Sequence, residues 1–365
     1  MSVDWAAVRE EFPALAHWTY LNTATFGQLP KRAVEASLGH FRHRDERACS
    51  DFLSWFDDAD AIRGLAAQWI GAQAEDIAFV PNASSALAIL LNGIAWRSGD
   101  RIVTLQGEFP NNLYIPALCQ DRGVEFVEAA WETFYESINE RTRLVALSTV
   151  NYTNGFRLPA EEVSAFLRQR GVLLYLDGTQ SVGALRFDVA KVQPDMLAVH
   201  GYKWLLSPNG AGFVYIAPGL RQLLPPNVVG WRSDKRWRQV DHLHHGVPEF
   251  LDAAEKYEGG MLPFPCLYAM GASLEMLLEI GADVVERRVL ELAAKLRAVL
   301  ESKGGQIQHL GSPILAARFE GRDASALARE LQAQRILVSA RHGNLRVSVH
   351  LYNNEEDLER LRRAL

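Results

Sequence analysis

The sequence predicts an α/β protein with a mostly parallel sheet, and three observations favour this class. Short apolar runs alternate with helical patterns along much of the chain. The run at 172–176 is continuously apolar, which is typical of a parallel strand buried on both faces. It ends on Asp177, and a second run at 196–199 leads to Lys203. Because open α/β sheets bind ligands at the carboxyl ends of their strands, we expect this acid and this amine to face one pocket.

The pairing of Asp177 with Lys203 has a chemical use if the ligand is pyridoxal 5′-phosphate. A lysine amine holds the aldehyde of this cofactor as a Schiff base, and a carboxylate beside the pyridine nitrogen keeps that nitrogen protonated. Each residue alone has an ordinary explanation, as a strand-end acid that caps a turn or as an exposed lysine. Together, each at the end of its own apolar strand, they favour a cofactor site with Lys203 and Asp177 as the catalytic residues.

Three segments around this pair resemble the class V aminotransferase family. They read DGTQS at 177–181, HGYK at 200–203 and GAG at 210–212. This family contains fold-type I enzymes dependent on pyridoxal 5′-phosphate, among them cysteine desulfurases, isopenicillin N epimerase-like proteins and kynureninase. The resemblance covers nearly the whole chain. It implies a large domain with a mostly parallel seven-stranded sheet and a small C-terminal α+β domain.

The length and composition fit such an enzyme. A chain of 365 residues usually forms two lobes, and 22% charged residues is ordinary for a globular protein. The net charge of −6 argues against nucleic acid as a partner. We expect the cytoplasm, because the three cysteines are scattered and the N-terminus lacks the apolar core of a signal peptide. No apolar run approaches the roughly 20 residues of a membrane helix. The expected domains are an arm at 1–20 that packs on the small domain, a large cofactor-binding domain at 21–255 and a small domain at 256–365.

The chain opens with an amphipathic helical pattern that Pro13 stops, followed by an extended segment at 20–25. This segment, YLNTAT, is similar to the family's opening motif, whose backbone lines the substrate side of the pocket. The resemblance therefore implies that Asn22 and Ala24 contact the substrate. An arm that only packs explains the pattern equally well. The further elements expected before Asp177 are strands at 77–80, 101–105, 124–127 and 144–148, and helical patterns at 30–70, 86–95 and 161–170.

The segment PNASS at 81–85 joins a predicted strand to a predicted helix. Small polar residues at a helix start leave free N–H groups at the positive end of the helix dipole, which is typical of a phosphate site. The resemblance implies that Ala83, Ser84 and Ser85 bind the phosphate of the cofactor. Ordinary capping of the helix by Ser84 is the alternative.

Other residues are expected around the cofactor ring. In the family an aromatic ring or imidazole at the end of the strand 101–105 stacks on the pyridine face, and Phe109 fits stacking but cannot shuttle protons. The resemblance places Asn151 near the phenolic oxygen of the cofactor. Gln180 should reach the same oxygen from the other side with its amide. We expect His200 and Tyr202, which precede the lysine, to contact the cofactor as well.

The stretch after the predicted sheet is rich in aromatic and charged residues. Gly230-Trp231 is similar to a kynureninase-like segment that approaches the cofactor phosphate from the other subunit, so Trp231 is expected to bind cofactor in a homodimer. Met261 replaces a threonine that normally makes such a contact. The basic stretch at 232–238 is interpreted as a solvated face or as a loop near an anionic ligand. The histidines at 242–245 lack further ligands nearby, so we expect a substrate-side loop and no metal.

The C-terminal segment at 345–357 resembles the family signature LRxSxHxYNxxxD. Its arginine grips the α-carboxylate of the substrate, and here that residue is Arg346. A planar, two-pronged donor gives a carboxylate a fixed orientation. The other expected elements of this part are helices at 265–279, up to about 300, at 324–334 and from 355, and strands at 314–319, 336–339 and 345–349.

The loop at 339–344 bears on the reaction. Cysteine desulfurases carry a nucleophilic cysteine shortly before the arginine, whereas this loop is short and has none. We therefore expect an enzyme that acts on a small amino acid through a carbanion, of epimerase or aminotransferase type, and not a desulfurase with a cysteine relay. A kynureninase-like or C–S lyase enzyme and a catalytically silent binding protein are alternatives. A nucleotide-binding oxidoreductase is disfavoured, because no GxGxxG follows a strand.

Overall fold

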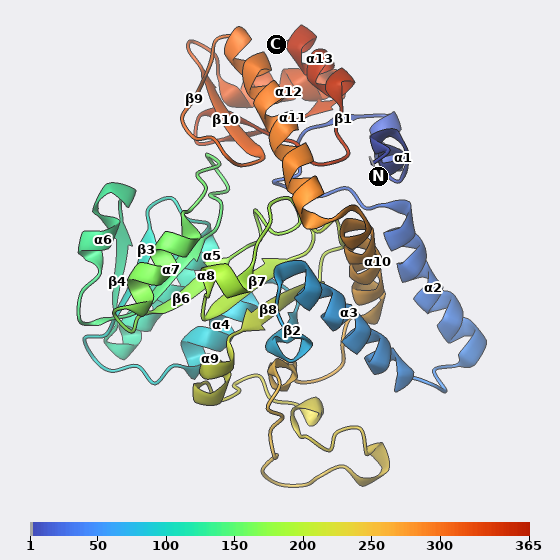
Figure 1. Cartoon of the computed structure of the whole chain (residues 1–365), viewed down its shortest axis with the longest axis vertical. Coiled ribbons are helices and arrows are strands. Elements are labelled where there is room, and N and C mark those ends of the chain that lie inside the picture. The colour runs from blue at the N-terminus through green and yellow to red at the C-terminus, as the bar shows by residue number, and fades with distance from the viewer. Residues whose placement is uncertain (1–2) are drawn as a thin grey trace.

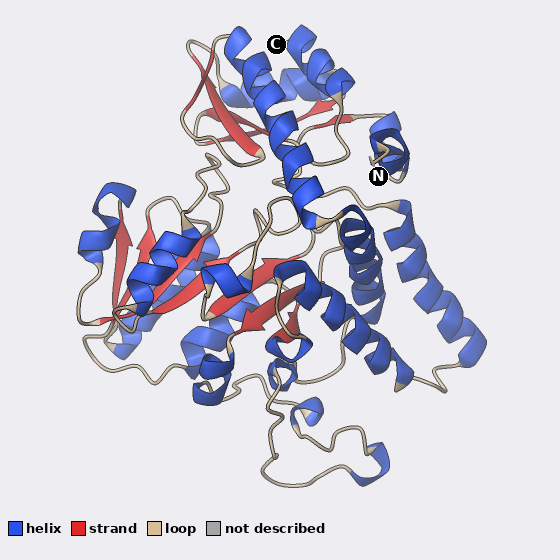
Figure 2. Cartoon of the chain, in the orientation of Figure 1, coloured by secondary structure: helices blue, strands red, loops and turns tan. Residues whose placement is uncertain are grey.

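The predicted α/β class is confirmed by a computed structural model that describes residues 3–365 (Figures 1 and 2). Its large sheet has seven strands: β2 Ile77–Val80, β3 Arg101–Leu105, β4 Glu125–Ala129, β5 Thr142–Ser148, β6 Leu173–Asp177, β7 Met196–His200 and β8 Gly212–Ile216. The strand order is β2-β8-β7-β6-β5-β3-β4. Strands β4, β3, β5, β6 and β7 are parallel, and β8 pairs antiparallel with both β7 and β2.

The large sheet is buried on both faces, as its apolar runs predict. Alternate side chains of β6 enter different cores: Leu174 and Leu176 belong to one, and Tyr175 belongs to the other. Figure 2 shows helices on both sides of the strands. The helices of the chain are α1 Trp5–Glu10, α2 Lys31–Arg47, α3 Ser54–Ile70, α4 Ala83–Gly93, α5 Pro110–Ala117, α6 Phe134–Ser137, α7 Ala160–Arg168, α8 Val189–Val192, α9 Pro218–Leu223, α10 Phe264–Ile280, α11 Ala282–Ser302, α12 Ala324–Ala333 and α13 Glu355–Ala364. None of the helices within residues 3–365 is long and apolar enough to cross a membrane.

The helical pattern at 30–70 is two helices rather than one. The first, α2, ends where Ala48 and Cys49 adopt left-handed backbone angles, with φ of 49° and 60°. Such angles are unusual for residues with a Cβ, and the residues between the two helices, 48–53, include no glycine or proline to signal the break. The chain then turns back into α3, and α10 packs against both helices (Figure 1).

The small lobe is built on an antiparallel sheet of four strands, in the order β12-β13-β10-β9. The N-terminal arm is attached to this lobe by a parallel pair of short strands, because Thr19 pairs with Ile336 and Tyr20 with Leu337. The strands are β1 Thr19–Tyr20, β9 Gly305–Ile307, β10 Ile314–Phe319, β11 Ile336–Leu337, β12 Ser339–Arg341 and β13 Asn344–Ser348. Their core is closed by side chains of α11, α12 and α13.

Helix α10 packs with the large domain, whereas the expected boundary at residue 256 assigns this helix to the small domain. Side chains of α10 share one hydrophobic core with the large sheet, and Val289 of α11 still belongs to that core. From Leu292 onward, buried side chains of α11 belong instead to the core of the small lobe. We therefore propose that the two lobes divide within α11, which Figure 1 shows running from one to the other.

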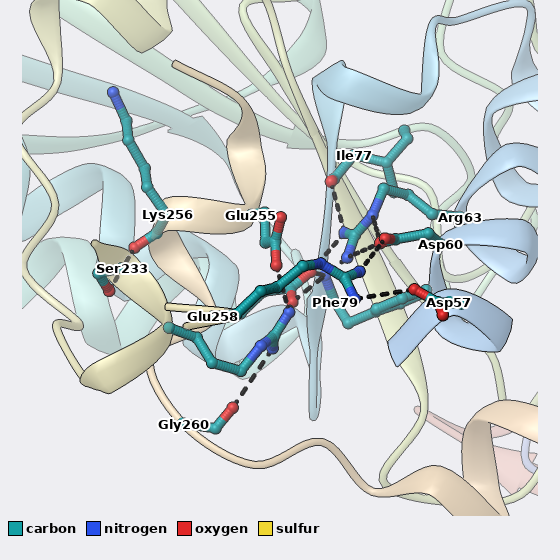
Figure 3. A network of polar contacts seen from close by, with 12 residues as sticks. Asp57, Asp60, Arg63, Ile77, Phe79, Ser233, Glu255, Lys256, Glu258 and Gly260 are labelled. Carbon is teal, nitrogen blue, oxygen red and sulfur yellow. Dashed lines mark hydrogen bonds and ion pairs between the residues drawn. The ribbon is translucent and has the colours of Figure 1, made fainter. Parts of the chain in front are cut away.

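A buried ion-pair network connects the long excursion after β8, residues 217–263, to α3 and β2 (Figure 3). The Glu258 carboxylate, whose side chain is fully buried, accepts a hydrogen bond from Nη1 of Arg232 at 2.9 Å and from the backbone N–H of Phe79 at 2.7 Å. It also pairs with Arg63. Nη2 of Arg232 lies 2.5 Å from Oε1 of Glu255. Because this network buries Arg232, the interpretation of 232–238 as a solvated or anion-facing loop is wrong for that residue.

We expect Glu258→Gln to destabilise the protein strongly. Without the carboxylate, Arg63 and Arg232 lose their shared counter-charge, and breaking a buried pair costs about 3–5 kcal/mol. The urea midpoint of unfolding measures the loss. The control is Glu249→Gln, which removes a half-exposed ion pair with Lys235 and should leave the midpoint almost unchanged. Equal midpoints for the two variants would contradict the network.

Candidate active site

The carboxyl ends of β5, β6 and β7 meet at a small cavity, which residues at all three strand ends line. Larger cavities occur elsewhere. In one of them two charged lining residues, Arg157 and Glu286, form an ion pair with each other at 2.9 Å. Seven of the predicted site residues line the cavity at the strand ends: Ala83, Phe109, Asp177, Gln180, His200, Tyr202 and Lys203.

Lys203 is held in the cavity by its backbone. The loop after β7 that carries it lies against the N-terminal arm, where the N–H of Gly27 donates to the carbonyl of Tyr202 at 2.9 Å. A Cβ at Gly27 would lie 1.9 Å from the carbonyl oxygen of Lys203, so only glycine allows this approach. The Lys203 amine lies 5.1 Å from the ring centre of Tyr202 and 5.5 Å from that of Phe109. The arm and the loop therefore fix where the amine emerges.

The environment of Lys203 favours a reactive amine. Burial lowers its pKa to about 7, with Asp177 opposing the shift and the charges of Arg346 and Arg341 adding to it. A large fraction of the amine is then neutral near pH 7, which is the form that attacks a carbonyl and accepts a proton.

Asp177 ends β6 in the floor of the cavity. Its side chain is only 5% exposed, and Oδ1 accepts the backbone N–H of Thr179 at 2.8 Å. Burial raises the pKa of this carboxyl, while the hydrogen bonds of Thr179 and the charge of Lys203 oppose the rise. A positive partner in the cavity would hold it ionised.

A second buried acid, Glu108, was not foreseen from the sequence. It accepts hydrogen bonds from Ser148, at 2.7 Å from the backbone N–H and 2.5 Å from Oγ, and from Nδ2 of Asn112 at 3.1 Å. Burial raises the pKa of this carboxyl, and the nearby charge of Asp177 does so too. Glu108 thereby clamps the loop that carries Phe109 onto the end of β5.

The ring of Phe109 stands at the cavity wall against Tyr152, with ring centres 5.1 Å apart and the planes perpendicular. Phe109 directly precedes α5, which begins at Pro110. Its position therefore suits stacking on a planar ligand. The cavity also contains four lining residues that the sequence analysis missed: Asn111, Ser148, Tyr152 and Thr179. Ser148 had a usable signal, because it ends a strand as Asp177 does.

The start of α4 reaches the cavity only in part. Asn82, not Ser84, caps this helix, because its Oδ1 accepts the N–H of Ser85 at 2.9 Å and the Ser85 hydroxyl at 3.2 Å. Ala83 lines the cavity, whereas Ser84 and Ser85 do not. The amino end of α4 still lies at the cavity, which suits an anion.

Besides Ser84 and Ser85, two further predicted cofactor residues, Asn151 and Trp231, lie outside the cavity. Asn151 donates to the carbonyl of Gly107 at 2.9 Å, and its Oδ1 accepts the N–H of Thr153 at 2.9 Å, so the side chain shapes the turn. The next residue, Tyr152, reaches the cavity instead. Trp231 packs against Phe56 and Trp237, with ring centres 5.8 and 5.4 Å apart.

The amide of Gln180 joins the site to the N-terminal arm. Its Nε2 donates to the carbonyl of Ala24 at 3.0 Å, and its Oε1 accepts the indole N–H of Trp204 at 2.9 Å. Ala24 in turn donates its N–H to Oγ of Ser348 in the small lobe at 2.9 Å. The Gln180 amide, which was expected to donate to the phenolic oxygen of the cofactor, therefore already uses one N–H within the protein.

Arg346 lies beside the cavity and is 1% exposed. It donates through Nη1 to the carbonyl of Tyr152 at 2.7 Å and through Nη2 to Oγ1 of Thr25 at 2.6 Å. The same Thr25 hydroxyl donates to Oδ1 of Asn22 at 2.9 Å. Asn22 therefore positions the contact between Thr25 and Arg346, and it does not itself line the cavity. Burial, followed by the charge of Arg341, lowers the pKa of Arg346 to about 10.

The residues present fit pyridoxal 5′-phosphate. His200 lines the cavity, and its Nε2 is buried without a hydrogen-bond partner among the described residues. Burial and the charge of Lys203 lower the pKa of His200 to about 4, so this ring is neutral and free to bond a ligand. A neutral amine, a buried carboxylate, an aromatic wall and a helix start complete the donor set that this cofactor needs.

The fold and this site define a class of α/β enzymes that bind pyridoxal 5′-phosphate through a lysine at a strand end. The family model for the class-V aminotransferases matches residues 19–361, and the chain belongs to this family. Membership confirms both the predicted cofactor and the prediction of an enzyme.

Known relatives cover nearly the whole chain. A probable cysteine desulfurase of Methanothermobacter thermautotrophicus is 26% identical over 98% of this chain and 96% of its own. The isopenicillin N epimerase of Amycolatopsis lactamdurans is 28% identical over 100% and 98%. Among solved structures, the apo cysteine desulfurase of Thermococcus onnurineus has a TM-score of 0.89 at 21% identity, covering 100% of this chain and 97% of that one. A cystine C–S lyase in complex with its reaction product cysteine persulfide has a TM-score of 0.90 at 22% identity, covering 96% and 98%. These likenesses support the fold.

Proposed function

We propose that this enzyme acts on a small free amino acid, with epimerase- or aminotransferase-type chemistry at the α-carbon. The observation that carries the proposal is the cavity that joins the Lys203 amine to the Asp177 carboxylate beside Arg346. Pyridoxal 5′-phosphate, when bound, supplies an electron sink for charge that develops at the α-carbon. Lys203 removes and returns the proton there, because its amine is partly neutral near pH 7. Asp177 provides the negative charge that keeps the bound ring protonated.

We do not assign a cysteine relay to this site, although relatives named as desulfurases are similar to it. The segment before Arg346 is a tight hairpin, in which Arg341 pairs with Asn344 across His342 and Gly343. Both turn residues have positive φ, 48° and 78°, which is the pattern of a two-residue turn. None of the three cysteines lines the cavity. This hairpin supports chemistry that Lys203 performs alone.

A Cβ-cleaving enzyme, kynureninase-like or a C–S lyase, is the second candidate. The observation that favours it is the Phe109-Pro110 pair, whose ring faces the cavity in place of an imidazole. A benzene ring does not exchange protons, so every proton transfer falls to Lys203.

The absorption spectrum of the purified protein and an amino-acid screen test the proposed function. We expect a near-visible band that borohydride removes, and a panel of amino acids that changes it. Chiral analysis, 2-oxo acid formation and release of sulfide or alanine separate epimerisation, transamination and Cβ cleavage. A band that no amino acid alters and no turnover would instead indicate a silent binding protein.

Replacement of Arg346 by alanine should raise KM for amino acids steeply. Loss of the charge-assisted bonds to the α-carboxylate costs roughly 2–3 kcal/mol, on the order of 30–150-fold in KM. Lysine should restore only part of this loss, because an ammonium group does not form two parallel bonds. Decarboxylated amines should be affected much less, and they are the control for damage to the site. If Arg346→Ala has the same KM as the wild type for every amino acid, the substrate lacks a free carboxylate.

We also propose a homodimer in the cytoplasm. Large apolar side chains stand exposed on α2, at Val34, Leu38 and Phe41, and on the excursion after β8, at Val229 and Val247. Such exposure is typical of a surface that another chain covers. In a dimer Trp231 and Met261 would approach the partner's site from this excursion. Sedimentation of a fully active monomer at low concentration would refute the dimer. The free cysteines support a reducing compartment.

A further inference from the structure

We propose that Arg341 binds a second anionic group on the substrate, so that the enzyme prefers amino acids with an anionic side chain, a carboxylate or a sulfinate. This inference rests on the proposed function, because it names the substrate class of the same site. It depends on the geometry of the hairpin formed by β12 and β13, and on the absence of acidic partners for two arginines.

The hairpin places Arg341 and Arg346 on one face of the small sheet. Ser339 lies directly opposite Arg346, and Arg341 follows Ser339 by two residues. Side chains two apart on a strand share a face, and directly opposed residues share it as well. Arg341 and Arg346 are therefore diagonal neighbours, which stand about 7–8 Å apart in antiparallel pairs.

This face turns toward the cavity. Arg346 donates to the carbonyl of Tyr152, and Tyr152 lines the cavity. At the tip of the hairpin the His342 ring lies 6.4 Å from the Tyr152 ring. In the hairpin, Arg341 therefore lies between Arg346 and the tip, and both Arg346 and the tip residue His342 lie near Tyr152. A ligand whose α-carboxylate is bound by Arg346 would extend its side chain along this wall.

Neither arginine is paired with an acid within residues 3–365. Arg341 donates only to the carbonyl of Ala340, at 2.7 Å, and both contacts of Arg346 are neutral oxygens. The Nε of Arg346 is buried with no partner among these residues. Elsewhere in the chain a buried arginine has its carboxylate, as Arg63 and Arg232 have Glu258.

The charge of Arg341 is felt inside the site. After burial, it is the next cause that lowers the pKa of Arg346, to about 10, and it also contributes to lowering the pKa of Lys203. Two guanidinium groups without acids repel each other, and an anion between them relieves the repulsion. A single α-carboxylate satisfies Arg346. A second anionic group on the same ligand satisfies Arg341, through the two-pronged geometry that arginine offers.

Calorimetric binding of unreactive ligands to the cofactor-loaded enzyme tests the inference without turnover. Succinate and glutarate carry two charges, whereas succinamate carries one, and none has an amine that reacts with the cofactor. We expect the wild type to bind the better dianion at least about 10-fold more tightly than succinamate. Arg341→Gln should abolish this preference, and Arg341→Lys should keep part of it. The control Arg318→Gln, at an exposed position of β10, should preserve it.

Amino-acid screening then identifies the anionic group, with aspartate, glutamate and cysteine sulfinate compared against asparagine and glutamine. A wild type that binds succinamate as tightly as both dianions overturns the inference, as does an Arg341→Gln variant that keeps the preference. Failure of the proposed function is a separate result, because the cofactor band would be missing from the wild type or no amino acid would change it. If Arg341→Gln keeps the cofactor band but loses the preference for dianions over succinamate, the result supports Arg341 as the residue that binds the second anionic group.

Discussion

Replacement of Lys203 by alanine should abolish turnover and leave the fold intact. The amine is both the covalent anchor for the cofactor and the proposed base, and the loss of a positioned acid–base group alone costs about 10²–10⁴-fold. The lowered pKa of Lys203 shows that burial works against its charge, so its removal should not cost stability. Activity at saturating substrate and cofactor measures the first effect, and the thermal midpoint measures the second.

Peptide mapping after borohydride reduction locates the anchor. In the wild type the peptide containing Lys203 should gain the mass of the reduced cofactor, and Lys203→Ala should gain none. Lys256 is a comparison within the same protein, because it is also buried but its amine donates to the carbonyl of Arg221 at 2.8 Å. Label on Lys256, or on any other lysine, would move the anchor and overturn the site.

The sequence could predict that Lys203 and Asp177 face one cavity, because this placement depends on local patterns. Each lies at or just beyond the end of an apolar run, and parallel strands bring such ends to one edge of the sheet. Arg346 was predictable for a different reason, since it belongs to a motif that resembles a known family. The same local signal marks Ser148 at the end of β5.

Glu108 could not be predicted, because its burial depends on partners that are distant in the sequence. An acid in a loop is normally exposed, and besides the nearby Asn112 it is the hydroxyl and N–H of Ser148, 40 residues on, that make the buried position tolerable. Arg232 follows the same logic, since its partner Glu258 lies 26 residues later. Hydrogen bonding across the fold decides such positions, and it leaves no periodic pattern.

The sequence also could not decide which of two neighbouring residues faces the cavity. The Asn151 side chain closes its own turn, and the next residue, Tyr152, lines the cavity instead. Composition also leaves the domain boundary open between residue 256 and α11, because α10 is apolar on most sides and fits either lobe. Only the position of α2 and α3 decides which core it joins.

Replacement of Asp177 by asparagine should slow turnover on the order of 10²–10³-fold, the usual effect of removing one preorganised electrostatic group. The amide is nearly the same shape, and its oxygen can still accept the N–H of Thr179, so the turn after β6 should survive. What is lost is the negative charge. The rate of proton exchange at the α-carbon of the substrate, followed by NMR in D₂O, measures this step directly.

The same substitution has a second readout that does not depend on turnover. The Asp177 charge raises the pKa of Lys203, so its removal should take that pKa below about 7 in the cofactor-free protein. NMR of the ¹³C-methylated amine can follow this titration. Asp195→Asn is the matched control, because Asp195 lies at the opposite end of β7, where Oδ2 accepts the N–H of Leu174 at 2.8 Å. If Asp177→Asn changes neither the exchange rate nor the Lys203 titration, Asp177 does not face the amine or the ring, and the acid of this site must be sought in Glu108.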